Sequence, residues 1–190
     1  LTKDHIREAW DKIGDIDILI MPLETPPETI LEAARLAKSR NAQVVLNPAP
    51  ARLLEEDLLS LVDVLVPNEH EIFDISNSTN NEIDTVSRTL ISQGVTSVVT
   101  TLGSKGVSIV DREKDEIRLS PYSVDVLDTT AAGDSFVAAL AVGLAEGKTL
   151  VDACHFANAV GALTVTKMGA QPSLPTRSEV TDFLDQQETK

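Results

Sequence analysis

The segment 128–136 (DTTAAGDSF) combines the residue types of an anion site with an acid. Its small residues precede an alanine-rich helical pattern that begins near Gly133. Such a turn leaves backbone N–H groups uncovered at a helix N-terminus, where the helix dipole favours negative charge. A carboxylate beside a bound polyanion costs electrostatic energy, so an acid kept there, Asp134, is expected to be used. The segment therefore predicts phosphoryl transfer, with amides for the phosphate and Asp134 as base for the attacking hydroxyl.

The elements that must position this segment alternate between two patterns. Continuous apolar runs separated by amphipathic helices indicate a parallel sheet covered on both faces, an α/β doubly wound fold. The predicted strands are 15–21, 42–46, 62–66, 97–102 and the stretch 122–127, and the predicted helices are 27–40, 54–61, 82–93 and three that begin near 133, 150 and 178. Residues 107–110 and 116–119 flank a charged turn and predict an antiparallel hairpin. Because no linker interrupts the pattern, we expect residues 1–190 to form one domain.

Polar, glycine or proline residues follow each predicted strand. Ligands of open parallel sheets bind outside the carboxyl ends of the strands, so these segments are expected to form one site. Besides DTTAAGDSF, the segments are Leu23-Glu24-Thr25, Asn47-Pro48-Ala49-Pro50, Asn68-Glu69-His70-Glu71 and Gly103-Ser104-Lys105-Gly106.

Composition excludes several classes of partner. The formal net charge of -14 argues against nucleic acid and anionic membranes, because both need a basic surface. No apolar run approaches the roughly 18 residues of a membrane span, and the polar start of the chain is not a signal peptide. The single cysteine, Cys154, fits a reducing compartment and therefore the cytoplasm. Three scattered histidines provide no zinc-ligand spacing.

Two glycine-containing segments imitate nucleotide motifs. Residues 143–149 resemble a phosphate-binding P-loop, but their glycines are four apart and they end a helix, so we interpret them as a C-cap. Residues 103–106 lead into a hairpin rather than a helix and are no dinucleotide fingerprint.

Taken jointly, these segments resemble the carboxy-terminal part of ribokinases, in the PfkB family of sugar kinases. DTTAAGDSF is similar to the second signature of that family, and 47–51, 67–69, 101–106 and 169–173 also resemble ribokinase segments. The resemblance covers essentially the whole chain and implies a three-layer αβα sandwich. What it does not cover is the amino-terminal portion of the family, which carries sugar contacts and a β-sheet lid used in homodimerisation.

The resemblance also implies roles for individual residues of an ATP-dependent kinase acting on ribose. Asp134 corresponds to the catalytic base and also contacts the sugar, and Ala131, Ala132 and Gly133 correspond to the anion hole. The nucleotide residues are Thr101, Gly103, Ser104, Gly106, Gly133 and Asn158, together with Asn68 and Glu71, which organise phosphates and Mg²⁺ through water. Glu24 corresponds to a carboxylate near the sugar. An activating K⁺ would be held by Asp128, Thr130, Thr164, Lys167, Gly169 and Ser173, several through backbone carbonyls.

Structural alternatives exist for most of these residues. Asp134 is also a residue type common at helix N-termini, and Asn68 and Glu71 have the spacing of a capping box. Glu24 is equally an ordinary loop residue, residues 103–106 a simple turn, and Asn158 a side chain whose partner is protein rather than adenine. Two further functions stay open: a fragment that binds nucleotide without turnover, and a kinase for another sugar or nucleoside.

Overall fold

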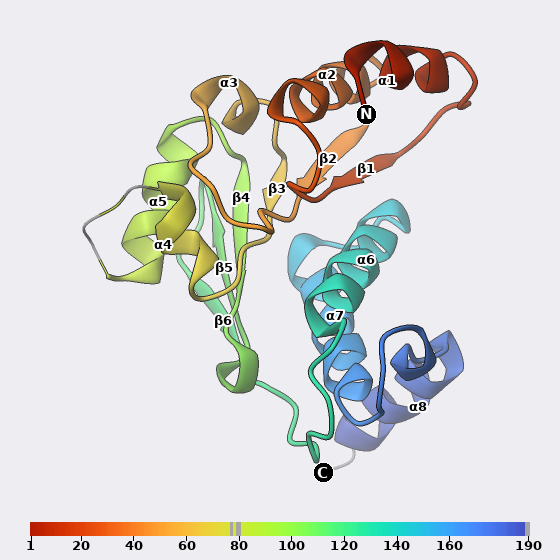
Figure 1. Cartoon of the computed structure of the whole chain (residues 1–190). Coiled ribbons are helices and arrows are strands. Elements are labelled where there is room, and N and C mark those ends of the chain that lie inside the picture. The colour runs from red at the N-terminus through yellow and green to blue at the C-terminus, as the bar shows by residue number, and fades with distance from the viewer. Residues whose placement is uncertain (77, 79–80, 189–190) are drawn as a thin grey trace. The chain divides into compact units, whose positions relative to one another are not determined.

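The computed structural model describes residues 1–76, 78 and 81–188. The chain divides into two compact units, which are described separately (Figure 1). The sheet unit comprises residues 1–102 and 108–118, and the helical unit comprises residues 103–107 and 119–190. The expectation of a single domain stays a prediction.

In the part of the chain that the structure describes, six strands form one sheet whose spatial order follows the chain (Figure 1). They are β1 (Ile18–Met21), β2 (Gln43–Leu46), β3 (Val64–Leu65), β4 (Ser97–Thr101), β5 (Val107–Asp111) and β6 (Ile117–Leu119). The first four are parallel, with Met21 opposite Leu46 and Leu65 opposite Val98. Five residues separate β4 from β5 and β5 from β6, too few for a crossover, so these neighbours run antiparallel. The mostly parallel sheet and its hairpin agree with the sequence pattern.

The helices of the sheet unit are α1 (Lys3–Trp10), α2 (Pro27–Ser39), α3 (Glu56–Leu59), α4 (Glu71–Ser76) and α5 (Ile83–Ser92). In α2, Pro27 occupies the first turn, where its missing N–H costs nothing. Ile30, Ala33, Ala34 and Ala37 recur at helical spacing and are all buried in the core of the unit. The helix α2 packs against β1 and β2.

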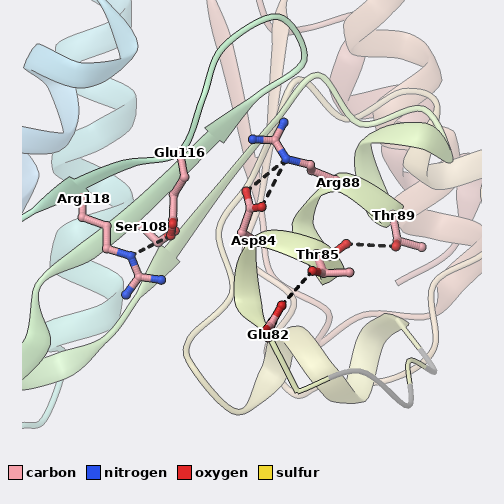
Figure 2. Close-up of polar contacts among 8 residues, drawn as sticks. All are labelled: Glu82, Asp84, Thr85, Arg88, Thr89, Ser108, Glu116 and Arg118. Atoms are coloured by element: carbon pink, nitrogen blue, oxygen red, sulfur yellow. Dashed lines mark hydrogen bonds and ion pairs between the residues drawn. The ribbon is translucent and has the colours of Figure 1, made fainter.

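Polar contacts fix the hairpin and α5 (Figure 2). Glu116 accepts hydrogen bonds from the Ser108 hydroxyl and, at 2.8 Å, from Arg118. On α5, Asp84 pairs with Arg88 one turn later. The Ser108–Glu116 contact links β5 to the residue before β6, and the Asp84–Arg88 pair lies within α5.

The helical unit contains α6 (Ala132–Ala145), α7 (Leu150–Thr164) and α8 (Arg177–Glu188), with short 3₁₀ turns at Gly103–Lys105 and Gln171–Ser173. A Cβ at Gly143 would lie 3.0 Å from the Cβ of Ala153, so glycine permits the close approach of α6 and α7. Gly147 has a φ of +80° just after α6 ends, which confirms the C-cap interpretation of residues 143–149. None of the described helices has the length and apolarity that a bilayer crossing requires.

Several expectations about elements differ from the structure. Residues 122–127 are irregular rather than a strand, because strand formation requires a hydrogen-bonded neighbour and not only alternating side chains. The strand expected at 62–66 shortens to Val64–Leu65, and the helix expected at 54–61 shortens to Glu56–Leu59. The helix α4 has no counterpart among the expected elements, although the capping-box spacing of Asn68 and Glu71 is typical of a helix start.

Candidate active site

The N-terminus of α6 is open at the place where the sequence predicts the anion hole. Ala131 precedes the helix with a φ of 60°, a left-handed conformation that reverses the chain into the first turn. A Cβ added at Gly133 would meet no described atom within 4 Å, so packing does not require glycine there. Asp134 is exposed in the same turn, and no described residue pairs with its carboxylate. The N-terminus of α6 therefore has open space at Gly133 next to the carboxylate of Asp134, which has no partner among the described residues.

The amides of this turn are not equivalent. The N–H of Ala132 donates to the Thr129 carbonyl at 3.2 Å, and the N–H of Ser135 donates to the Ala131 carbonyl at 2.9 Å. No described acceptor takes the N–H of Ala131 or Gly133. A helix leaves its first N–H groups without intrahelical partners, and these two are available to a phosphate. Ala132, one of the three residues expected in the anion hole, already has its amide engaged.

Asp128 links the start of this segment to the chain that follows α7. One carboxylate oxygen accepts the N–H of Thr130 at 2.9 Å, and the other accepts the N–H of Gly169 at 2.8 Å. The hydrogen bond from Gly169, and then those from Thr130, lower the pKa of Asp128. The N–H groups of Leu127 and Asp128 also donate to the Val165 carbonyl, at 2.8 and 3.2 Å. The structure therefore brings together Asp128, Thr130 and Gly169, three of the six predicted K⁺ ligands.

The other three lie on the same stretch of chain. Thr164 ends α7, and its buried hydroxyl lies within hydrogen-bonding distance of the Val160 carbonyl and the Ser135 hydroxyl. Lys167 donates its amide N–H to the Thr164 carbonyl, and Ser173 donates both its hydroxyl and its N–H to the Ala170 carbonyl. The set thus offers one carboxylate and otherwise hydroxyl and carbonyl oxygens. Oxygen donors of this kind can bind a cation, so the residues are compatible with a K⁺ site, which stays a prediction.

In the sheet unit, the segments after β1 to β4 lie along one edge. The N–H of Leu23 donates to the Ala49 carbonyl at 2.8 Å, and the Asn47 amide donates to the Val66 carbonyl at 2.9 Å. Asn68 and Thr101 form an isolated parallel bridge. Three of the five predicted post-strand segments, 23–25, 47–50 and 68–71, are thus adjacent where the parallel strands of this unit end. Glu24 is exposed on the first of them, and Thr101 ends β4.

Asn68 and Glu71 form a reciprocal capping box at the start of α4. The Asn68 side-chain oxygen accepts the N–H groups of His70 and Glu71, both at 2.9 Å. Glu71 in return accepts the Asn68 N–H at 2.8 Å through Oε2. The structural interpretation of this pair is therefore observed, while Oε1 of Glu71 can still accept a hydrogen bond from a water molecule. No group of three His, Cys, Asp or Glu residues that could hold a metal occurs among the described residues.

Two further nucleotide predictions have structural explanations. Gly103 and Gly106 have φ values of +56° and +89° around a 3₁₀ turn, and Ser104 is exposed between them. A Cβ at Gly106 would lie 1.9 Å from the Leu119 carbonyl oxygen, so only glycine fits. Asn158 on α7 donates to the Ser120 carbonyl at 2.9 Å, which gives this side chain a partner within the protein. Its side-chain oxygen can still accept a hydrogen bond from a ligand.

Two residues near the site were absent from the sequence-based expectations. Ser135 is buried, and its hydroxyl donates to the Ala132 carbonyl at 2.9 Å. The same hydroxyl lies 3.0 Å from that of Thr164, and this contact ties the first turn of α6 to α7. Glu179 on α8 pairs with Lys167 at 2.8 Å. The spacing Thr176-x-x-Glu179 is that of a capping box and was the available signal for the second. No local pattern marks Ser135, because its partner is 29 residues away.

Similarity to known proteins decides the family. The profile of the pfkB family carbohydrate kinases matches residues 1–177. The chain belongs to this family. It is 38% identical over 188 residues to the ribokinase of Haemophilus influenzae, covering 97% of the chain and 61% of that protein. The chain thus spans about 60% of the length of such curated relatives.

Solved structures agree with the fold. A ribokinase from Thermotoga maritima superimposes with a TM-score of 0.88 at 37% identity, covering 97% of this chain and 61% of that one. A ribokinase from Arabidopsis thaliana, solved with ribose and ATP, gives a TM-score of 0.86 at 30% identity over 97% of this chain and 59% of that one. These similarities confirm the α/β sandwich of ribokinase type.

Proposed function

We propose that the chain is the catalytic part of an ATP-dependent kinase that converts D-ribose to D-ribose 5-phosphate. The observation that carries the proposal is the open N-terminus of α6, where free space at Gly133 adjoins the unpaired carboxylate of Asp134. Membership of the pfkB family supports a carbohydrate acceptor. The ribokinases among the relatives, one of them solved with ribose and ATP, support ribose as that acceptor.

In this reaction the primary hydroxyl of the sugar attacks the γ-phosphorus. The O–H bond breaks and its proton passes to Asp134, the new O–P bond forms, and the bond to the bridging β,γ-oxygen breaks to release ADP. The amides of Ala131 and Gly133 donate to the transferring phosphoryl oxygens. Donors of this kind contribute about 2.7–4 kcal/mol each in other enzymes. Since the transition state is loose, positioning and charge stabilisation carry most of the catalysis.

Two cations complete the proposal. Mg²⁺ bound with ATP neutralises phosphate charge, and Asn68 and Glu71 would hold it through water, as this hard cation prefers. K⁺ would be held by the six residues grouped around Asp128 and Gly169. Thr101, Gly103, Ser104, Gly106 and Asn158 would line the nucleotide, and Glu24 would contact the sugar.

The direct test replaces Asp134 in the whole kinase. We expect Asp134→Asn to lower kcat by more than tenfold, because general base catalysis contributes about 10²–10⁴-fold. Asp152→Asn is the matched control: Asp152 occupies the first turn of α7 and accepts a hydrogen bond from Thr149. It should lose stability but keep kcat. If Asp134→Asn reduced kcat less than tenfold, the base assignment would be wrong.

A second experiment separates catalysis from binding alone and ribose from other sugars. Titration calorimetry measures ATP binding to the 190-residue chain, and a coupled ADP assay measures phosphorylation of ribose, 2-deoxyribose, fructose and a nucleoside. ATP binding without sugar-dependent turnover would favour a nucleotide-binding fragment. Turnover with another acceptor in preference to ribose would show that this acceptor, and not ribose, is the substrate.

For the whole kinase we further propose a homodimer that works in the cytoplasm, where a single unpaired cysteine stays reduced.

A further inference from the structure

The connection between α7 and α8, residues 165–176, carries three of the six predicted K⁺ ligands. It is held on one side by the segment that precedes α6. Val165 accepts two backbone N–H groups there, and the N–H of Gly169 donates to Asp128 at 2.8 Å. These contacts fix the two ends of the stretch 165–169. Lys167 lies between them: its N–H donates to the Thr164 carbonyl at 3.3 Å, and its side chain has a separate support.

That second support is Glu179 on α8. One of its carboxylate oxygens accepts a hydrogen bond from the Lys167 ammonium at 2.8 Å. The other accepts the N–H of Thr176 at 2.6 Å and its hydroxyl at 2.9 Å, which makes a capping box at the start of α8. Both oxygens are therefore committed. The hydrogen bond from Lys167, and then those from Thr176, lower the pKa of Glu179 to about 2.

The start of α8 is itself anchored within the helical unit. Arg177 forms an ion pair with Glu146 at the end of α6 and lies 5.5 Å from the ring centre of Phe156 on α7. Val180 is buried, and the Phe183 ring contacts Tyr122 edge-on at 5.2 Å. Glu179 thus projects from a fixed helix, and an ion pair to it restrains the position of Lys167.

We propose that Glu179 is a positioning residue for the cation site: it orients Lys167 so that its backbone carbonyl can bind K⁺, and it neutralises the ammonium beside that cation. The inference rests on the proposed K⁺ site. An ammonium without its carboxylate partner would repel a neighbouring cation, and a lysine without its restraint would leave the carbonyl free to turn away. Both effects weaken K⁺ binding without touching the acid that takes the proton, Asp134.

The test measures cation binding through thermal stability. Melting temperatures of the 190-residue chain are recorded in KCl and NaCl mixtures at constant ionic strength, and the K⁺ concentration at half-maximal stabilisation is compared between variants. Glu179→Gln removes the charge but keeps an acceptor for Thr176, and Lys167→Met removes the other partner. We expect Glu179→Gln to raise the half-saturating K⁺ about two- to fivefold, the size of a partly exposed ion pair. Glu146→Gln, which breaks the other ion pair of α8, should leave it unchanged.

The outcomes separate the two levels of the argument. If K⁺ stabilises the wild type no better than Na⁺, the K⁺ site is wrong and the role of Glu179 falls with it. If the wild type responds to K⁺ and Glu179→Gln has the same midpoint, only the positioning role is wrong. A lower melting temperature at every K⁺ concentration with an unchanged midpoint also contradicts it, because that result describes a cap alone. Lys167→Arg, which keeps the ion pair, should retain the wild-type midpoint.

Discussion

The carboxylate of Asp128 accepts the backbone N–H of Gly169 at 2.8 Å, across 41 residues of sequence. The same side chain accepts the N–H of Thr130, so it closes the turn before α6 and fastens the connection after α7. Gly169 has a φ of +85°, a conformation that points its amide toward the carboxylate with little strain. The Asp128 side chain therefore joins the turn before α6, where a phosphate is expected to bind, to the connection after α7, which carries predicted K⁺ ligands.

This relationship predicts the effect of Asp128→Ala. This substitution removes the acceptor of the Thr130 and Gly169 N–H groups, so both amides become open to exchange with solvent. The effect is expected to be large because hydrogen bonds to a carboxylate are stronger than neutral ones. We expect the hydrogen-exchange protection of the Thr130 and Gly169 amides to fall about tenfold or more, as measured by NMR. Asp125→Ala, at an exposed position three residues earlier, is the control. Unchanged protection at Gly169 would contradict the link.

Gly106 and Gly103 form a matched pair for the turn before β5. Both have positive φ, but only Gly106 would place a Cβ against backbone, 1.9 Å from the Leu119 oxygen. Gly103→Ala should cost about 1–2 kcal/mol for the left-handed conformation alone. Gly106→Ala should cost at least about 1–3 kcal/mol more, because the backbone has to move. Urea unfolding measures both, and equal losses would show that crowding at Gly106 is relieved without cost.

Cys154 is expected to be inert in the folded protein. It is fully buried on α7, and burial raises the pKa of its thiol to about 12. Because the thiolate is the reactive form, an aromatic disulfide reagent at pH 8 should label it only after urea unfolding. Cys154→Ala provides the background. Rapid labelling without denaturant would mean that α7 opens readily.

The contact between α1 and α2 should depend on pH in a defined direction. Arg7 donates to Glu32 at 2.6 Å, and this hydrogen bond lowers the pKa of Glu32. Because the pKa of Glu32 is lower in the folded state, the stabilisation by the Arg7–Glu32 pair is complete above the unfolded pKa, about 4.3. This stabilisation disappears as the pH falls through the folded pKa. Glu32→Gln should therefore be less stable than the wild type at pH 7, and the difference should shrink toward pH 3.

Fluorescence of Trp10 provides the measurement, since this tryptophan is the only one in the sequence and lies buried at the end of α1. Urea midpoints are compared at the two pH values. Glu8→Gln, at an exposed position of the same helix, should show no such convergence. A constant difference between wild type and Glu32→Gln at both pH values would argue against the ion pair as its cause.

The sequence pattern predicted those helices and strands whose ends are set by neighbouring residues in the chain. The helix expected at 27–40 ends one residue earlier in the structure, because proline and apolar periodicity together mark its ends. Alternation over 122–127 misled, since the sequence does not show whether a neighbouring strand is available. In the site, the motif predicted the helix that begins at Ala132, and the role of Asp134 stays a prediction. The engagement of the Ala132 amide and the support from Glu179 depend on three-dimensional contacts, which spacing does not reveal.

The spatial order of the strands has a consequence for biosynthesis. Since β1 to β6 lie side by side in the order in which they occur in the chain, each new strand leaves the ribosome after its neighbour. Pairing can then advance step by step along the growing edge, without waiting for a distant segment. The Asp128–Gly169 hydrogen bond joins residues that emerge much later. The sheet can thus assemble during translation, and the predicted K⁺ ligands around Asp128 and Gly169 come together after it.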